Sequence, residues 1–221
     1  MPAHMQNEIE KLKKRILSLC ATVETNLWAA VRSIAERDSN RAQEVIQNDS
    51  KIDNMEIDVE EDCLKILALH QPVAVDLRFI VAVLKINNDL ERIGDLAVNI
   101  AERAAYLADK PPVNMSFDFV DMAEKVQTML KNSLDALVNL DTDLAHAVCG
   151  ADDTIDALNR RVYLEVEKAT KKNFDQIPSL LHLLSVSRHL ERIADHATNI
   201  AEDVIYMVDG RITRHKTESY K

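Results

Sequence analysis

The sequence contains few of the residues that turn or break a helix. Only 3 glycines and 5 prolines occur among its 221 residues, and a chain with so few turn-formers is expected to fold into long helices. No stretch of about 18 consecutive apolar residues occurs, so a transmembrane helix is not expected. The N-terminal segment MPAHMQNEIEKLKKRI lacks the apolar region of a secretory signal. Hydrophobic residues make up 47% of the chain, which is typical of a globular protein and not of a disordered one.

Basic residues are also scarce relative to acidic ones. The formal net charge is −10, which disfavours nucleic acid as a principal partner because phosphate contacts need a basic face. Attraction to anionic lipid is disfavoured in the same way, so contact with a membrane is expected only through partner proteins. An acidic chain attracts cations instead.

Motifs of covalent and catalytic chemistry are missing as well. Cys20, Cys63 and Cys149 are widely spaced and form no Cys-x-x-Cys pair, which indicates free thiols in a reducing cytoplasm. The chain has no P-loop, no GxSxG and no dinucleotide fingerprint. We therefore predict no catalytic centre.

One segment of the chain occurs twice. The segment LERIGDLAVNIAE at 90–102 returns as LERIADHATNIAE at 190–202, with 10 of 13 positions identical at an offset of 190 − 90 = 100 residues. A match of this length within one chain indicates a duplicated structural unit.

Apolar residues at helical spacing predict six long helices, at 6–36, 41–69, 75–107, 118–140, 143–172 and 178–208. Gly210 is the expected C-cap of the last one. The stretch 110–116, which contains Pro111-Pro112, is the one clear linker. Helices of this length need antiparallel packing of their apolar stripes. The predicted fold is therefore all-α, with two tandem, pseudo-symmetric three-helix bundles of the spectrin-repeat kind at 1–110 and 116–211 and a flexible tail at 212–221.

The repeated segment carries its polar and apolar residues on different faces of one helix. At about 100° per residue, four polar residues share a stripe about 80° wide, namely Glu91, Asp95, Asn99 and Glu102. Four apolar residues fall on the other side and are expected in the core, namely Leu90, Ile93, Ala97 and Ile100. The second copy repeats this division with 100 added to each number.

The preceding helix of each half carries a matching stripe. In the first half it consists of Asp49, Asp53, Glu56 and Glu60, and in the second of Asp152, Asp156 and Asn159. Aligning Ile52 with Ile155 gives an offset of 155 − 52 = 103, so the second half is three residues shorter between its two stripes. We expect the loop around His70-Gln71-Pro72 to account for the difference.

The acidic stripes have two interpretations, a solvated surface or a metal site. Like charges four residues apart destabilise a helix by roughly 0.2–0.5 kcal/mol per pair, yet both halves carry this pattern without a basic residue in the stripe. Carboxylate and amide oxygens are hard ligands that suit Mg, Ca, Mn or ferric iron. We therefore predict metal sites. The candidate ligands are Asp49, Asp53, Glu56, Glu91, Asp95 and Asn99 in the first half and Asp152, Asp156, Glu191, Asp195 and Asn199 in the second.

Other side chains near the stripes are weaker candidates. No Glu-x-x-His pair occurs, although ferritin-like di-iron enzymes need such pairs, so a surface cluster is favoured over a buried redox centre. His196 is expected at a helix contact rather than as a ligand, and His189 is expected to face solvent, with a phosphoacceptor role as the less favoured alternative. Arg92, Arg192 and Arg78 are expected to pair with nearby acids.

Four motifs are specific enough to compare with known families. They are DSKIDNME at 49–56, HQPVAVDLR at 70–78, DLERIGDLAVNIAE at 89–102 and RHLERIADHATNIAEDVIYMVDG at 188–210. The chain resembles the PhoU family over nearly its whole length. The resemblance implies surface acid-x-x-x-Asp motifs that bind multinuclear iron, with Zn, Mg, Mn, Ca and Ni also open. The matching pairs are Asp49/Asp53, Glu91/Asp95, Asp152/Asp156 and Glu191/Asp195, while Asn159 replaces an acid, which implies a weaker second site.

The same resemblance implies a function. PhoU proteins are bacterial accessory proteins of phosphate transport that restrain phosphate uptake and keep the phosphate-sensing histidine kinase quiet, through contacts with the kinase and with the phosphate ABC transporter, here expected through its ATPase subunit. The resemblance also implies a cytoplasmic protein, often a homodimer, without enzymatic activity. The expected function is thus a metal-binding adaptor that acts as a negative regulator. Two alternatives stay open: a metal-dependent enzyme or iron-handling protein, and a helical scaffold with solvated acidic faces.

Overall fold

The structure is a computed structural model that describes residues 3–113, 117, 119–172 and 174–210. Over these residues it contains six α-helices and no strand. The helices are α1 (Ala3–Glu36), α2 (Ser39–His70), α3 (Ala74–Ala108), α4 (Phe119–Asn139), α5 (Thr142–Thr170) and α6 (Ile177–Asp209). The all-α prediction is confirmed, and each helix begins and ends within three residues of its expected position. The predicted tail at 212–221 and part of the predicted linker, 114–116, lie outside the described residues.

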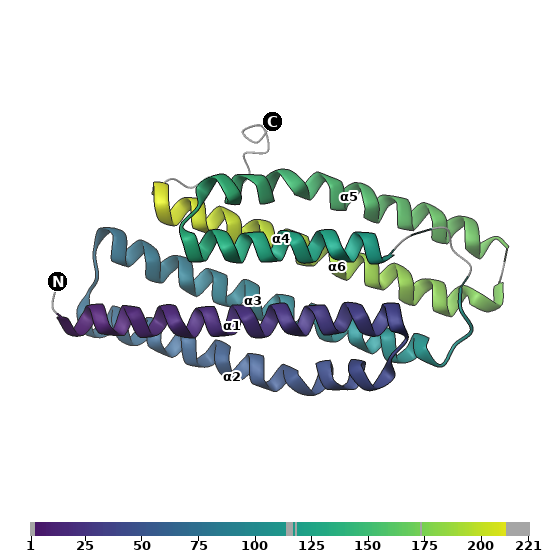
Figure 1. Cartoon of the computed structure of the whole chain (residues 1–221), viewed down its shortest axis with the longest axis horizontal. Helices are drawn as coiled ribbons and strands as arrows, with labels where there is room; N and C mark the ends of the chain where they lie inside the picture. Colours follow the sequence, from purple (N-terminus) through teal and green to yellow (C-terminus); the bar gives the residue numbers. More distant parts are fainter. Residues whose placement is uncertain (1–2, 114–116, 118, 173, 211–221) are drawn as a thin grey trace.

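The six helices form two three-helix bundles that lie side by side (Figure 1). The first bundle consists of α1, α2 and α3, and the second of α4, α5 and α6. The bundles meet where α3 packs against α6 and α1 packs against α4. None of the helices described here has an apolar stretch long enough to cross a membrane.

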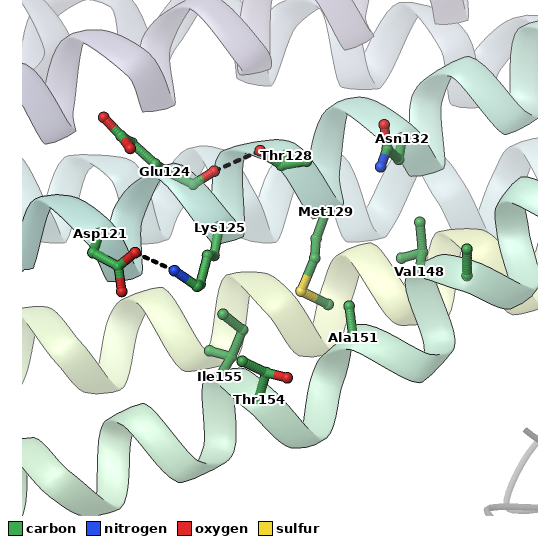
Figure 2. A pocket seen from close by; sticks show the side chains of 11 residues that line it. Asp121, Glu124, Lys125, Thr128, Met129, Asn132, Val148, Ala151, Thr154 and Ile155 are labelled. Carbon is green, nitrogen blue, oxygen red and sulfur yellow. Dashed lines mark hydrogen bonds and ion pairs between the residues drawn. The ribbon is translucent and has the colours of Figure 1, made fainter. Parts of the chain in front are cut away.

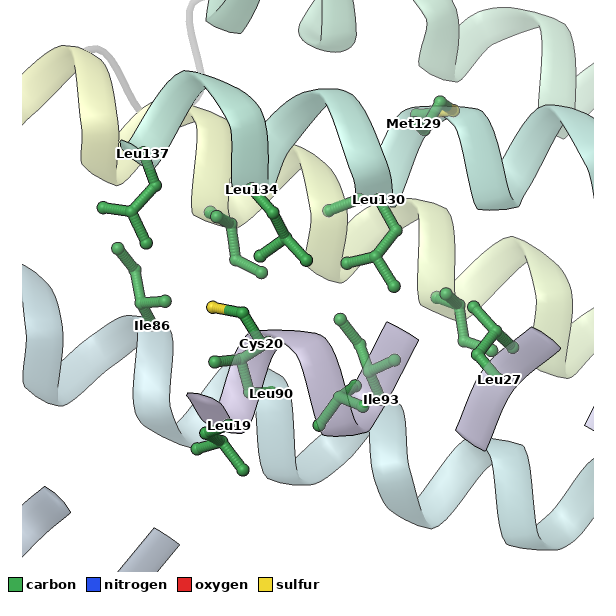
Figure 3. Close-up of a cluster of buried hydrophobic side chains, with 14 of the residues drawn as sticks. Leu19, Cys20, Leu27, Ile86, Leu90, Ile93, Met129, Leu130, Leu134 and Leu137 are labelled. Atoms are coloured by element: carbon green, nitrogen blue, oxygen red, sulfur yellow. The ribbon is translucent and has the colours of Figure 1, made fainter. Parts of the chain in front are cut away.

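One hydrophobic core extends through both bundles. In Figure 3, Cys20 of α1 and Leu90 of α3 lie opposite Leu130 and Leu134 of α4. The repeated apolar residues are all buried, as the helix wheel predicts: Leu90, Ile93, Ala97 and Ile100, with Leu190, Ile193, Ala197 and Ile200. Apart from a small separate cluster of Val162, Val166 and Leu180, most buried apolar side chains of the two bundles belong to one contiguous cluster, so each repeat stabilises the other.

Cys20 and Cys63 are free thiols, as expected. Cys20 and Cys63 are buried and Cys149 is half-buried. Burial raises the pKa of the Cys20 and Cys63 thiols to about 12. Both therefore stay protonated at neutral pH and act as small apolar side chains.

Polar groups close the helix ends at the short connections. The Asp38 carboxylate accepts hydrogen bonds from the backbone N–H groups of Asn40 and Arg41, at 3.0 and 3.1 Å, and so caps α2. Gly210 ends α6 with a φ of 72°, and its N–H donates to the carbonyl of Tyr206 at 2.9 Å. A left-handed residue at this position favours glycine, and the predicted C-cap is confirmed.

The three-residue difference between the halves does not lie in the loop around His70-Gln71-Pro72, and that prediction was wrong. The first-half connection covers 71–73, whereas the second covers 171–176 and includes a 3₁₀ turn, Phe174–Gln176. The second connection is therefore three residues longer, and the helices between the two stripes are six residues shorter, three of them in α5 and three in α6. Pro178 lies in the first turn of α6. Proline is tolerated in a helix only there, so α6 cannot begin earlier.

Candidate metal centre

The two acidic stripes of the first bundle lie against each other across α2 and α3. Burial raises the pKa of Asp49, and the charges of Asp53 on its own helix and Asp95 on α3 raise it further. Burial likewise raises the pKa of Glu91, assisted by Asp95 on its own helix and by Glu56 and Asp53 on α2. Acids on each helix therefore raise the pKa of an acid on the other, as expected if the stripes face each other. Burial also raises the pKa of Glu56, and the charge of Glu60 is the next largest cause.

Asn87 belongs to this site, although the sequence interpretation missed it. Its side-chain amide donates to the backbone carbonyl and to the carboxylate of Glu56, both at 3.0 Å. Asn87 lies one turn before Glu91 on α3, so the stripe could have been extended by four residues to find it. The contact fixes the orientation of the Glu56 carboxylate toward α3.

The second bundle repeats the arrangement across α5 and α6. Burial raises the pKa of Asp152, together with the charges of Asp156 and Asp153 on its own helix and of Glu191 on α6. Burial, Asp152, Glu191 and Asp156 raise the pKa of Asp195 from 3.8 to about 6. The pKa of Glu191 is also raised, first by burial and then by Asp156. The carboxylates of the second pair of stripes are thus brought together as well.

The polar contact at the edge of the site is duplicated with different chemistry. Ser187, which is Asn87 plus 100, donates its hydroxyl to the Asn159 side-chain carbonyl at 2.9 Å. Asn159 is Glu56 plus 103, so the pair Asn87–Glu56 of the first half corresponds to Ser187–Asn159 in the second. The second site therefore has one carboxylate fewer. The change from Glu56 to Asn159 is accompanied by a change of its hydrogen-bond partner, from Asn87 to Ser187.

The two candidate asparagine ligands differ in their surroundings. Asn99 donates to the backbone carbonyl of Asp95 at 2.8 Å. Asn199 instead turns toward the other bundle and donates to the Asp89 carboxylate at 3.3 Å. His196 also contacts Asp89, with 2.7 Å between Nδ1 and Oδ1, which confirms the expected helix contact. Asp89, another residue that the sequence interpretation missed, thus draws Asn199 and His196 together at the contact between α3 and α6.

Two arginines lie beside the acids. Arg92 is 3.4 Å from both the Glu91 and the Asp95 carboxylates, as expected, and Arg160 is 3.5 Å from Asp156. The arginine of each pair is solvent-exposed, and such surface pairs contribute at most about 1 kcal/mol. Two or more neighbouring acids at each site therefore still carry uncompensated charge.

Arg78, Arg192 and His189 do not have the surroundings that the sequence interpretation expected. Arg192 forms no ion pair within the described residues and acts on Glu191 only at longer range. The guanidinium of Arg78 packs against Gly210 at the C-terminal end of α6, where a Cβ would lie 3.2 Å from Nη1, and its buried Nε has no hydrogen-bond partner in the described part of the chain. The side chain of His189 is half-buried rather than solvent-facing. His189 lies seven residues before His196 and so shares the face of α6 that meets α3. This spacing was available in the sequence.

The donor set suits a hard cation, although no ion site is preassembled. Among the residues that the structure describes, no three His, Cys, Asp or Glu side chains are close enough to hold one ion. Like charges favour separated rotamers, and a cation between the helices would reverse that preference. Asp49 Oδ1 is buried without a hydrogen-bond partner, so one atom of the predicted ligand set is already turned away from solvent. Facing oxygen donors with raised pKa values are compatible with metal binding. Whether these residues are ligands stays a prediction.

Stability should depend on pH through these raised pKa values. The Asp195 carboxyl binds its proton more tightly in the native state than in the unfolded state, because its pKa rises on folding. Its contribution to the free energy of unfolding is therefore present below its ordinary pKa of 3.8 and is lost as pH rises through about 6. Asp195→Asn removes this loss. In a chelating buffer, the variant should therefore gain stability relative to the wild type between pH 4 and pH 7, as measured by urea unfolding at each pH. A stability difference that does not change with pH would show that Asp195 is not coupled to its neighbours.

A separate groove of about 430 Å³ lies between α4 and α5 (Figure 2). Its apolar lining includes Met129, Val148 and Ile155. Its polar groups pair along α4, where Asp121 bonds Lys125 and the hydroxyl of Thr128 donates to the carbonyl of Glu124 at 2.7 Å. The Asp121 carboxylate in this groove is thus already paired with a lysine, and the lining offers no facing carboxylates of the kind that the acidic stripes bring together.

Comparison with known proteins agrees with the duplicated fold. The PhoU domain matches twice, at 16–104 and at 119–204. A phosphate-specific transport system accessory protein PhoU homolog of Aquifex aeolicus is 39% identical over 209 residues, which cover 95% of this chain and 95% of that protein. A protein of the same name from Clostridium acetobutylicum is 33% identical, over 93% of this chain and 94% of that protein.

Solved structures give the same result. The crystal structure of PhoU from Pseudomonas aeruginosa superimposes with a TM-score of 0.90 at 36% identity, over 93% of this chain and 99% of that one. The phosphate transport system regulatory protein PhoU from Streptococcus pneumoniae gives a TM-score of 0.82 at 27% identity, over 94% and 98%. The family match in both repeats, relatives above 30% identity and the shared two-bundle fold agree with one another, and the chain belongs to the PhoU family.

Proposed function

We propose that this protein is an accessory protein of phosphate transport that restrains phosphate uptake and phosphate-starvation signalling. The observation that carries the proposal is the PhoU match in both repeats, with relatives named as accessory proteins of a phosphate-specific transport system. Those names describe an accessory protein and not an enzyme, in agreement with a sequence that carries no catalytic motif.

The proposed partners are the phosphate ABC transporter, through its ATPase subunit, and the phosphate-sensing histidine kinase, both reached from the cytoplasm. An adaptor of this kind needs apolar surface for protein contacts. Leu69, Val73 and Val75 surround the turn between α2 and α3 and are 66%, 73% and 61% exposed. Neighbouring apolar side chains this exposed favour a protein-binding role for that end of the first bundle. Self-association into a homodimer is part of the same proposal.

Metal binding at the acidic stripes is the second part of the proposal. Multinuclear iron is the expected metal, with Zn, Mg, Mn, Ca and Ni as alternatives. The first site would be held by Asp49, Asp53, Glu56, Glu91, Asp95 and Asn99, and the second by Asp152, Asp156, Glu191, Asp195 and Asn199. When bound, the ions would neutralise the facing carboxylates and link the two helices of each pair. This role is structural and changes the charge of the surface that a partner meets.

A metal-dependent enzyme is the less supported alternative. Di-iron enzymes of helical bundles hold the metal with Glu-x-x-His pairs, and the sequence has none. The acids also lie beside the exposed arginines Arg92 and Arg160 rather than in an enclosed cavity.

Deletion of the gene in the source organism tests the regulatory role. With any second copy of the gene also removed, phosphate uptake and the transcripts of phosphate-starvation genes should both rise in phosphate-rich medium. Uptake of labelled phosphate and transcript measurements report these two effects. Expression of the full chain should restore both. Normal uptake and normal repression in the deletion strain would rule out the proposed role.

A further inference from the structure

The face of α6 that precedes the second acidic stripe has the opposite charge. Ser185, Arg188, His189 and Arg192 line a hollow of about 410 Å³, together with Leu181 and Leu184. The Ser185 hydroxyl and His189 Nε2 are 3.0 Å apart. These residues lie within three turns of one helix, so their polar ends reach the same hollow.

The duplication provides an internal comparison for this hollow. Subtracting 100 from Ser185 and His189 gives Lys85 and Asp89 on α3. Lys85 is 3.1 Å from the Asp203 carboxylate, and Asp89 is 2.7 Å from His196, so both first-half residues have charged or ionisable partners on α6. Lys85 and Asp89 on α3 are thus both paired with groups on α6.

The corresponding residues in the second repeat cannot form the same pairs. Asp203 corresponds to Arg103 and His196 corresponds to Leu96. By the pseudo-symmetry of the two bundles, an arginine therefore replaces the acid that pairs with Lys85, and a leucine replaces the histidine that pairs with Asp89. The positive charge of Arg103 reaches His189 and, after burial, is the largest influence that lowers the pKa of its ring.

The arginines of the hollow have no close acid partner. Within the described residues, neither Arg188 nor Arg192 has a carboxylate within 4 Å. Glu191, their neighbour on α6, interacts with both at longer range, since each lowers its pKa. His189 Nδ1 is buried without a hydrogen-bond partner. Two guanidinium groups without a close carboxylate thus line one hollow of a chain whose net charge is −10.

We infer that the hollow binds a phosphate-type oxyanion, held by the guanidinium groups of Arg188 and Arg192 and by the Ser185 hydroxyl. A guanidinium donates two parallel N–H bonds to such an anion, which makes arginine the preferred partner of phosphate. The volume exceeds that of one tetrahedral anion and also admits the phosphates of a nucleotide. The existence of the site rests on the arginines alone, whereas the choice of phosphate among oxyanions rests on the proposed function.

Binding of inorganic phosphate to the full chain tests the inference by isothermal titration calorimetry. The wild type should bind with a Kd of about 1 mM or tighter, and Arg188→Gln with Arg192→Gln should weaken binding by about tenfold or more, since both bonds to charged groups are lost. Lys11→Gln with Lys14→Gln is the matched control, because it removes the same charge from exposed positions of α1. The control should bind as the wild type does. Circular dichroism verifies that both variants fold.

Further arms separate the sources of the phosphate group. The titration is repeated with ADP. Tighter binding of phosphate would identify free phosphate as the ligand, and tighter binding of ADP would identify a nucleotide. In either case, the arginine variant should lose the binding. It is also repeated with EDTA, because binding that disappears with chelation would put the anion on a metal and overturn the inference. Absence of saturable binding, or equal binding by the arginine variant, would overturn it as well. Because no transporter is present, failure here leaves the deletion experiment unaffected.

Discussion

Replacement of Leu90 by alanine is expected to lower the free energy of unfolding by about 3–5 kcal/mol. Leu90, on α3, is fully buried and lies near Cys20 of α1 and opposite α4, where the cores of the two bundles join (Figure 3). Truncation removes buried methyl groups and leaves a cavity that the surrounding helices cannot close. A loss of this size is a large part of the roughly 5–15 kcal/mol by which domains are stable.

The duplication supplies the control, since Leu190 is the same residue at the same place in the second repeat. Leu190 borders an existing hollow of about 260 Å³ lined by apolar side chains of α1, α3, α4 and α6. It already lacks neighbours on one side, so its truncation removes fewer contacts. The loss for Leu190→Ala should be smaller by about 1 kcal/mol or more.

Guanidinium chloride unfolding measures both variants and tests the shared core at the same time. The single tryptophan, Trp28, lies on α1 and reports the first bundle, whereas far-UV circular dichroism reports all six helices. One core predicts coincident transitions for the two signals. Separate transitions would show that the two bundles do not share one core. Equal losses for the two leucine variants would show that the hollow beside Leu190 does not reduce the cost of its truncation.

Local periodicity predicts which face of each helix is buried but not which helices meet across the bundles. The burial of Leu90, Ile93, Ala97 and Ile100 follows from the 3.6-residue repeat within a single segment. The contact between Asp89 and His196 joins residues 107 apart in the chain, and no local pattern contains it. The same holds for Lys85 with Asp203, 118 apart. These contacts depend on how the bundles pack.

The errors have similar physical causes. His189 was assigned to solvent because it was considered alone, although its spacing from His196 places both on the face of α6 that meets α3. The three-residue difference between the halves was assigned to a loop because a sequence offset does not say whether helix or loop residues are missing. In contrast, the facing of the acidic stripes was predicted correctly, because each stripe follows from the wheel and consecutive helices are usually neighbours.

Because the acidic stripes occur twice, metal binding can be tested separately in each repeat. Glu91→Gln with Asp95→Asn should remove the metal of the first repeat, and Glu191→Gln with Asp195→Asn that of the second, so that each pair lowers the metal content by about half and all four changes abolish it. Elemental analysis of protein purified without chelator, then resupplied with iron or zinc, gives the stoichiometry. Glu165→Gln with Glu167→Gln is the matched control, because it removes two acids from α5 outside both stripes.

The two half-site variants should not be equivalent. The second site has Asn159 where the first has Glu56, and Asn199 is engaged with Asp89. It therefore offers fewer charged oxygens, and hard cations bind more weakly as ligand charge falls. Titration of metal into the variant that keeps only the second site should give the weaker affinity. Each amide pair should also stabilise the metal-free bundle by a few tenths of a kcal/mol, because it removes like charges four residues apart. Unchanged metal content in the fourfold variant would place the ligands elsewhere and leave the stripes as solvated faces.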